Sequence, residues 1–146
     1  MDLERAIEIA AAAHRGQTDK AGQPYILHPL RVMLACEGEA TRIVAVLHDV
    51  IEDSDWTPEA LRAEGASDAI LAAVDTVTRR DDETYAEFIE RAARNEIGRA
   101  VKIADLHDNL DLSRIAQPTQ ADFARMERYR AALQHLGAQL PELAGK

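Results

Sequence analysis

The chain has 146 residues, 47% of them hydrophobic and 29% charged, which is the length and composition of one globular domain with a sizeable core. Its formal net charge of −9 argues against long nucleic acids and anionic membranes as partners, because both favour a basic surface, whereas a small phosphorylated ligand needs only a few local cations. The single cysteine, Cys36, excludes an intramolecular disulfide and fits a reducing cytoplasm, and no apolar run is long enough to span a bilayer.

Helical signals follow one another along the chain. The clearest set has Thr57 as N-cap, Pro58 at the first helical position and Gly65 as the stop. Asp82 is the expected cap of a later helix, and Pro118 separates the last two. The expected helices cover residues 3–14, 29–36, 40–52, 58–64, 67–77, 83–95, 97–115 and 119–137.

No segment shows the alternation expected of a strand, so the predicted fold is all-α, a compact single-domain bundle of about eight helices over residues 1–146. The one long stretch without a helical pattern is "RGQTDKAGQPYILHP", residues 15–29, which carries His28. Loops of this kind often hold binding groups over a rigid scaffold. The sequence gives no indication of an oligomeric state.

An otherwise apolar segment, "VAVLHDVIEDSDWTP" at residues 44–58, carries an imidazole and several carboxylates. If it is a helix, His48 lies one turn before Glu52, and Asp49 lies one turn before Asp53. Burying such groups unpaired costs several kcal/mol per ion, on a rough scale, so the cluster must be neutralised. A divalent cation would neutralise it, because it accepts imidazole and carboxylate ligands together.

Two further residues of the ligand type stand in comparable surroundings. His28 ends the long loop, and Asp105 interrupts another apolar segment, "AVKIADLHDN". With His48 and Asp49 they would supply two nitrogen and two oxygen donors and leave positions for water or phosphate. Such a site suits Mn²⁺, Fe²⁺ or Zn²⁺ rather than Ca²⁺.

Four motifs in order resemble a known family: "AHRGQ" from residue 13, "PYILHP", "HD" followed by "ED", and "KIADLHDN". The pattern resembles the HD superfamily of metal-dependent phosphohydrolases. Within it, the chain resembles the hydrolase domain of RelA/SpoT-type enzymes of the stringent response, which remove the 3′-pyrophosphate from (p)ppGpp, and in size it is similar to the small alarmone hydrolases. The resemblance implies an all-α fold of the HD-domain type and a metal-dependent pyrophosphohydrolase activity.

The resemblance also assigns roles to individual residues. Mn²⁺ is the expected cofactor, with another divalent transition metal as the alternative. Glu52 and Asp53 match the pair that orients or deprotonates the attacking water. The expected metal ligands are His28, His48, Asp49 and Asp105. Lys20 and Asn109 match positions that contact the nucleotide. Arg15 and Lys102, which the family pattern does not assign, are two further expected substrate contacts.

Each role has a plainer competing explanation. The His-Asp pair could be a buried, hydrogen-bonded pair, and the two carboxylates that follow it could form a solvated helix end. Asp105 could simply be paired with Lys102. Arg15 and its neighbour His14 stand at a helix C-terminus, which favours cations without any role in a site.

Two segments depart from the family pattern at or beside expected nucleotide contacts. The family has Arg-Lys-Ser where this chain has Asp19, Lys20 and Ala21, and Met-Arg-Thr where this chain has Leu110, Asp111 and Leu112. The cation that stacks on guanine in the family is therefore replaced by a carboxylate.

The leading hypothesis is a metal-dependent hydrolase of (p)ppGpp or a related phosphorylated nucleotide. One alternative is an HD phosphohydrolase for another small nucleotide, such as a nucleoside monophosphate, which the two aspartates favour. The other is a catalytically silent nucleotide-binding module, against which the intact Glu52 and Asp53 argue.

Overall fold

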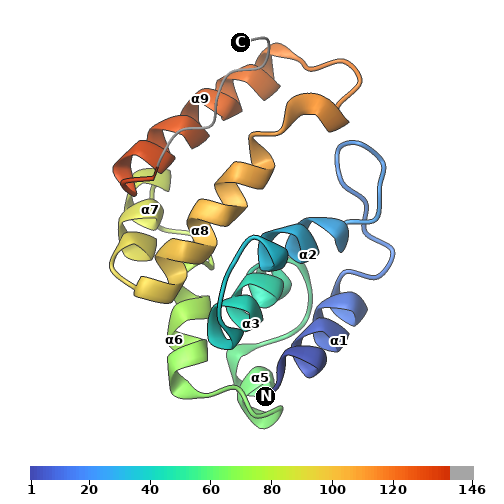
Figure 1. Cartoon of the computed structure of the whole chain (residues 1–146), viewed down its shortest axis with the longest axis vertical. Coiled ribbons are helices and arrows are strands. Elements are labelled where there is room, and N and C mark those ends of the chain that lie inside the picture. Colours follow the sequence, from blue (N-terminus) through green and yellow to red (C-terminus); the bar gives the residue numbers. More distant parts are fainter. Residues whose placement is uncertain (139–146) are drawn as a thin grey trace.

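The computed structural model describes residues 1–138, which form nine α-helices and one short 3₁₀ helix (Figure 1). The elements are α1 (Leu3–Ala13), α2 (Leu27–Leu34), α3 (Glu39–Leu47), α4 (Val50–Asp53), α5 (Pro58–Ala63), α6 (Asp68–Thr76), α7 (Tyr85–Ala93), α8 (Glu96–Asn109), η1 (Leu112–Arg114) and α9 (Gln120–His135). Within residues 1–138, the only β-type pairing is an isolated bridge between Thr18 and Pro24. The predicted all-α fold is confirmed.

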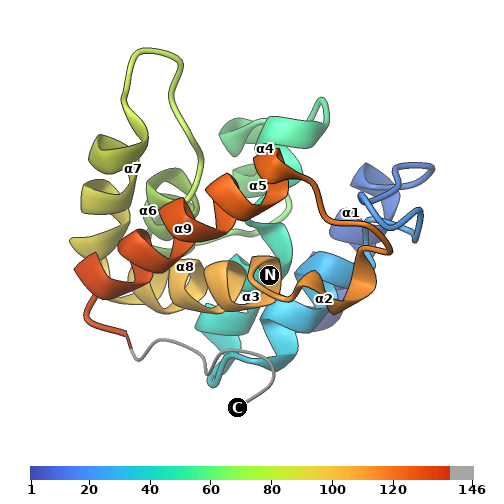
Figure 2. The ribbon, with the colours of Figure 1, turned by 90° about the horizontal axis from the view of Figure 1, so that it is seen from above.

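Helix α3 lies at the centre of the molecule, in contact with α1, α2, α6 and α8 (Figures 1 and 2). Its residues 43–47, "IVAVL", are almost completely buried, because neighbouring helices cover it on every side. A smaller apolar cluster, which includes Ile89, Leu106 and Leu133, joins α7, α8 and α9. Helix α8 contributes to both clusters and therefore fixes α9 relative to the centre. None of the described helices combines the length and apolarity that a membrane crossing requires.

The helix expected over residues 40–52 is interrupted at His48 and Asp49, which separate α3 from α4. In a continuous helix the Ala45 carbonyl would accept a hydrogen bond from the Asp49 N–H. Here the imidazole Nδ1 of His48 donates to that carbonyl at 2.6 Å. The His48 side chain thus takes the acceptor that the Asp49 N–H would use in a continuous helix. The His48–Asp49 pair therefore lies in a turn between two helices.

Two other helix starts differ from expectation. Helix α2 begins at Leu27, so His28 lies in its first turn and not in the preceding loop. Helix α7 is capped by Thr84 and not by Asp82, because Thr84 and Glu87 form a reciprocal capping box.

The helix expected over residues 97–115 ends earlier, at Asn109. The Asp111 side chain accepts a hydrogen bond from the Ser113 N–H and so caps the separate 3₁₀ helix η1. The signals around α5 are confirmed: Thr57 caps the helix, Pro58 opens it, and Gly65 follows its end with a φ of 99°.

Candidate metal centre and active site

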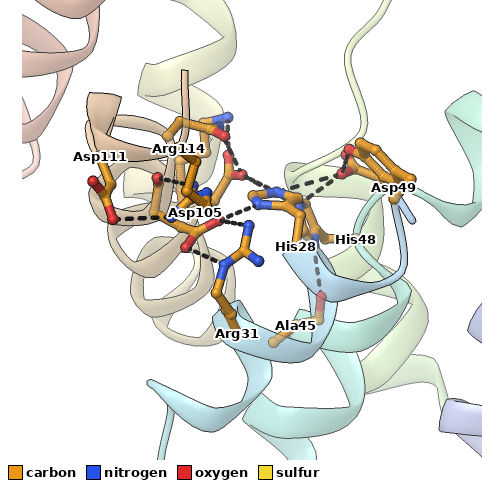
Figure 3. A network of polar contacts seen from close by, with 12 residues as sticks. His28, Arg31, Ala45, His48, Asp49, Asp105, Asp111 and Arg114 are labelled. Carbon is orange, nitrogen blue, oxygen red and sulfur yellow. Dashed lines mark hydrogen bonds and ion pairs between the residues drawn. The ribbon is translucent and has the colours of Figure 1, made fainter. Parts of the chain in front are cut away.

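Two buried imidazoles from different elements face each other near the middle of the molecule (Figure 3). His28 comes from the first turn of α2 and His48 from the turn between α3 and α4, and their ring centroids are 5.3 Å apart. Helix α8 brings Asp105 between them, with Oδ1 at 2.9 Å from His28 Nε2 and 3.3 Å from His48 Nε2. Both Nε2 atoms thus point at one carboxylate oxygen.

Asp49 supplies a second carboxylate from the same turn as His48. Its Oδ2 lies 3.1 Å from His48 Nε2 and 3.8 Å from His28 Nε2. Ligand atoms of His28, His48 and Asp49 all lie within 4.8 Å of one another, and Asp105 adjoins both imidazoles. The structure therefore brings together all four side chains that were expected to bind metal.

Contacts on the far side of each imidazole fix its orientation. His48 Nδ1 donates to the Ala45 carbonyl, and His28 Nδ1 donates to Asp108 Oδ2 at 2.7 Å. Arg31 holds that carboxylate in turn, with Nε and Nη2 at 2.7 and 3.0 Å from its two oxygens. Because both Nδ1 atoms are donors, the two Nε2 atoms are the ones that a metal ion would bind, in place of the protons that they share with the carboxylates.

The charges of the cluster favour ionised carboxylates. Burial opposes the charge on Asp49, but the adjacent His48 outweighs it and lowers the pKa of Asp49 to about 2. Burial also opposes the charge on Asp105, whose pKa nevertheless lies well below its usual value because Lys102 and the imidazoles stabilise the carboxylate. Lys102 Nζ lies 2.8 Å from Asp105 Oδ2 and is itself buried.

This donor set fits a divalent metal ion. Imidazole nitrogens are ligands that transition metals such as Zn²⁺ and Fe²⁺ favour, and ionised carboxylates also suit harder ions such as Mn²⁺. Their orientation is held by second contacts of the kind that accompany metal ligands in other proteins. The residues could therefore hold an ion at the point where α2, α8 and the α3–α4 turn meet.

Glu52 and Asp53, the expected water-activating pair, lie on α4 and are more exposed than the four ligand-type residues. The Arg79 N–H donates to Glu52 Oε1, and the Gln17 side chain donates to the Asp53 carbonyl. Partial burial raises the pKa of both carboxyls above their usual values, and the charge of Asp49 adds to the shift. Both groups are thus stronger bases than ordinary surface carboxylates.

A cavity of about 460 Å³ opens beside His28, a size typical of small-molecule sites. Lys20 and Asn109, two of the expected substrate contacts, line it. The other two do not: Arg15 is exposed elsewhere, and Lys102 is buried against Asp105. The cationic residues of the cavity wall are Lys20, Arg31, Arg114 and Arg125.

No family model matches the chain. The GTP pyrophosphokinase of Streptomyces coelicolor is 34% identical to it, over 92% of this chain and 18% of that protein. The guanosine-3′,5′-bis(diphosphate) 3′-pyrophosphohydrolases of Haemophilus influenzae and Aquifex aeolicus are each 32% identical, over 93% and 75% of this chain and 23% and 17% of their own lengths.

A solved structure of a metazoan SpoT orthologue that hydrolyses ppGpp has a TM-score of 0.74 and 26% identity, covering 92% of this chain and 82% of that one. The resemblance to the RelA/SpoT-type enzymes is confirmed. The chain spans less than a quarter of the length of the RelA/SpoT-type proteins from bacteria named above.

The two aspartates that depart from the RelA/SpoT-type pattern serve local structure. Asp19 Oδ1 accepts hydrogen bonds from the Ala21 and Gln23 N–H groups, both at 2.9 Å, and so closes the turn in the loop before α2. Asp111 caps η1 and pairs with Arg114. Both carboxylates nevertheless line the cavity and keep it less positive than the family pattern would.

Sequence reasoning missed three residues of the site. Tyr25 donates its hydroxyl hydrogen to Asp49 Oδ2 at 2.5 Å, and Asp108 with Arg31 orients His28. Asp108 stands three residues after Asp105 on α8, so helical spacing alone would have placed it on the same face. Tyr25 and Arg31 flank His28 within four residues, but nothing in their pattern distinguishes them from packing residues.

Proposed function

We propose that the chain is a phosphohydrolase that depends on a divalent transition metal, with Mn²⁺ as the first choice, and removes the 3′-pyrophosphate from (p)ppGpp or a closely related nucleotide. The observation that carries the proposal is the convergence of two imidazoles and two carboxylates beside a cavity of nucleotide size. The substrate class is the one for which its relatives are named. The single buried cysteine fits a cytoplasmic enzyme.

The ion would be held by His28, His48, Asp49 and Asp105. When bound, it supplies Lewis-acid activation of water and of a phosphoryl oxygen. Asn109 Nδ2 donates to Asp105 Oδ1 at 3.1 Å, which keeps this carboxylate directed toward the imidazoles.

Glu52 and Asp53 do the proton chemistry. One of them accepts the proton of the attacking water, whose oxygen bonds to the phosphorus next to the 3′-oxygen of the nucleotide. The bond from phosphorus to that 3′-oxygen breaks, and the oxygen leaves with the electron pair and takes up a proton. Their raised pKa values suit this role, because a base works best when its pKa approaches the working pH.

The cavity wall supports a second candidate, the hydrolysis of a less charged nucleotide. Arg31 is paired with Asp108, Arg114 with Asp111, and Arg125 with Asp122. Lys20, which is exposed, is the wall cation without a carboxylate partner within residues 1–138. A substrate with fewer phosphates would need fewer unpaired cations than ppGpp.

The test is a panel of nucleotides that includes ppGpp, pppGpp, GDP and nucleoside monophosphates, incubated with Mn²⁺-loaded protein. Pyrophosphate and phosphate release are measured separately. Glu52→Gln serves as the inactive variant, and Glu59→Gln, at an exposed carboxylate on α5, serves as the matched control. Pyrophosphate release from ppGpp by the wild type and the control supports the proposal. Phosphate release from a monophosphate alone would establish the second candidate, and no release from any nucleotide would contradict both.

A further inference from the structure

Lys102 is a buried cation that the proposed mechanism does not use. It lies on α8, only 9% of its surface is exposed, and it does not line the cavity beside His28. Its Nζ atom lies 2.8 Å from Asp105 Oδ2, and Asp105 is its one carboxylate partner within residues 1–138. Burying an ion pair costs free energy that the pair often does not recover, so stability alone does not explain it.

The two oxygens of Asp105 have different partners. Oδ1 lies 2.9 Å from His28 Nε2 and 3.3 Å from His48 Nε2, and it accepts a hydrogen bond from Asn109 Nδ2 at 3.1 Å (Figure 3). Oδ2 is the oxygen that the Lys102 ammonium holds. An ion bound between the two imidazoles would therefore meet Oδ1, while the ammonium covers Oδ2.

Two further features keep the ammonium in this place. Lys102 and Asp105 are three residues apart on α8, so they lie on the same face of one helix. The Lys102 Nζ atom also lies 4.8 Å from the centroid of the buried Phe88 ring, within the range of a cation–π contact. A charge-assisted bond and an aromatic face thus hold the ammonium together, and exchange of Oδ2 between Lys102 and an ion would break the first of these contacts.

The ammonium also changes the charge of the candidate metal centre. The carboxylates of Asp49 and Asp105 would balance the charge of a divalent ion, and imidazoles are neutral when they bind an ion. Within this group of residues, Lys102 then leaves a net positive charge. That charge favours an anionic phosphate at the coordination positions that the protein ligands leave open.

We propose that Lys102 is a positioning residue of the metal centre: by holding Oδ2 of Asp105, it limits this carboxylate to one bond with the ion and keeps a coordination position open for water or phosphate. The assignment rests on the proposed function for what fills that position, whereas the restraint on Asp105 concerns the metal centre itself. It replaces the substrate contact expected from the sequence, because Lys102 acts through Asp105.

A purely structural ion pair would have a different signature. Loss of Lys102 would then lower the stability and the metal content of the protein and leave the ligands of any bound ion unchanged. On our proposal, Lys102→Met, which keeps an unbranched side chain and removes the charge, frees Oδ2 to bind the ion in place of a water molecule. Arg62→Met, which removes a cation from an exposed ion pair with Asp68, is the matched control.

The first experiment measures how strongly bound Mn²⁺ enhances the proton relaxation of water, which reports the water molecules on the ion. We expect a smaller enhancement per bound ion in Lys102→Met than in the wild type and Arg62→Met. We also expect kcat/KM for the best nucleotide to fall about tenfold or more, the usual scale for a residue that orients a metal ligand. An unchanged enhancement per bound ion, or a wild-type kcat/KM in Lys102→Met, would overturn the assignment.

A second measurement needs neither activity nor a variant of Lys102. In a crystal structure of the wild type loaded with Mn²⁺, we expect Asp105 to bind the ion through Oδ1 alone, with Lys102 Nζ still on Oδ2. Two Asp105 oxygens on the ion, or an ammonium that has left Oδ2, would overturn the assignment whether or not Lys102→Met folds. A protein that shows the expected ligands and hydrolyses no nucleotide would contradict the proposed function alone.

Discussion

His28 and Asp108 are joined by a hydrogen bond of 2.7 Å although they lie 80 residues apart in the sequence. The carboxylate receives the Nδ1 proton of the imidazole and is itself held by Arg31. Burial opposes its charge, but the two cationic neighbours lower the pKa of Asp108 to about 2. The carboxylate therefore stays ionised and holds Nδ1 of His28 as the donor, so that Nε2 is the nitrogen directed toward the candidate metal site.

We expect Asp108→Asn to weaken Mn²⁺ binding by about 10- to 100-fold, because the amide accepts the Nδ1 proton less strongly and can turn a donor toward it. Calorimetric titration of the metal-free protein measures the change. Asp111→Asn, which removes an exposed carboxylate that does not contact His28, is the control. Equal affinities in the wild type and Asp108→Asn would show that this contact does not support a metal ligand.

Glu52→Gln should keep bound Mn²⁺ and lose turnover by roughly 10²- to 10⁴-fold, the range of a general-base contribution. The amide preserves the shape and can still accept the hydrogen bond from the Arg79 N–H. Steady-state kinetics on the best substrate test this prediction, and the metal content is measured on the same samples. Turnover at the wild-type rate would make Glu52 a structural residue.

The pH dependence of activity follows from the raised pKa values of Glu52 and Asp53. A base must be ionised to accept a proton, so activity is present above the pKa and lost as the pH falls through it. Because the pKa is raised, kcat/KM should begin to fall at a higher pH than an ordinary carboxylate would give. Profiles measured at saturating Mn²⁺ test this expectation, and a flat profile down to the usual carboxylate range would contradict it.

The negative charges of Asp19 and Asp111 should weaken the binding of a highly charged substrate. Asp19→Asn removes the negative charge while its amide oxygen can still accept from the Ala21 and Gln23 N–H groups, so the turn is kept. We expect a lower KM for ppGpp, with the largest gain at low salt, where screening is least. Asp55→Asn controls for total charge. An unchanged KM at every salt concentration would mean that the phosphates lie away from this part of the wall.

Helix α8 packs closely against α6 at Gly98. A Cβ added there would lie 2.1 Å from Thr76 Oγ1, which is far inside contact distance. Ala favours a helix by about 1 kcal/mol over Gly, but overpacking costs roughly 1–3 kcal/mol, so Gly98→Ala should destabilise the protein. Thr76→Ala should relieve the clash in the double variant. Urea unfolding of both single variants and the double variant gives the coupling, and additive effects would contradict the packing argument.

Capping and turn residues made most helix positions predictable, because signals such as Thr57–Pro58 act within a few residues. The interruption at His48 was not predictable, because periodicity cannot show that an imidazole will occupy the Ala45 carbonyl. The motif order indicated which side chains to compare, but the contact between His28 and Asp108 depends on the packing of α2 against α8. Contacts within a few residues could be predicted from the sequence itself, whereas contacts between distant segments could be predicted only where the family motifs linked them, as for His28, His48 and Asp105.

The four ligand-type residues come from segments far apart in the chain, with His28 and His48 lying 77 and 57 residues from Asp105. An ion bound to them would act as a cross-link between α2, the α3–α4 turn and α8, and would favour the folded chain by mass action over an unfolded chain that lacks the assembled site. Loss of the ion would free the ends of the two long chain segments that it links, from His28 to Asp105 and from His48 to Asp105. The entropy of closing such segments grows only slowly with their length, so both contribute on a similar scale. The melting temperature would thus rise with the free metal concentration. In limited proteolysis of the chelator-treated protein, we expect the first cuts near the place where α2 packs against α8.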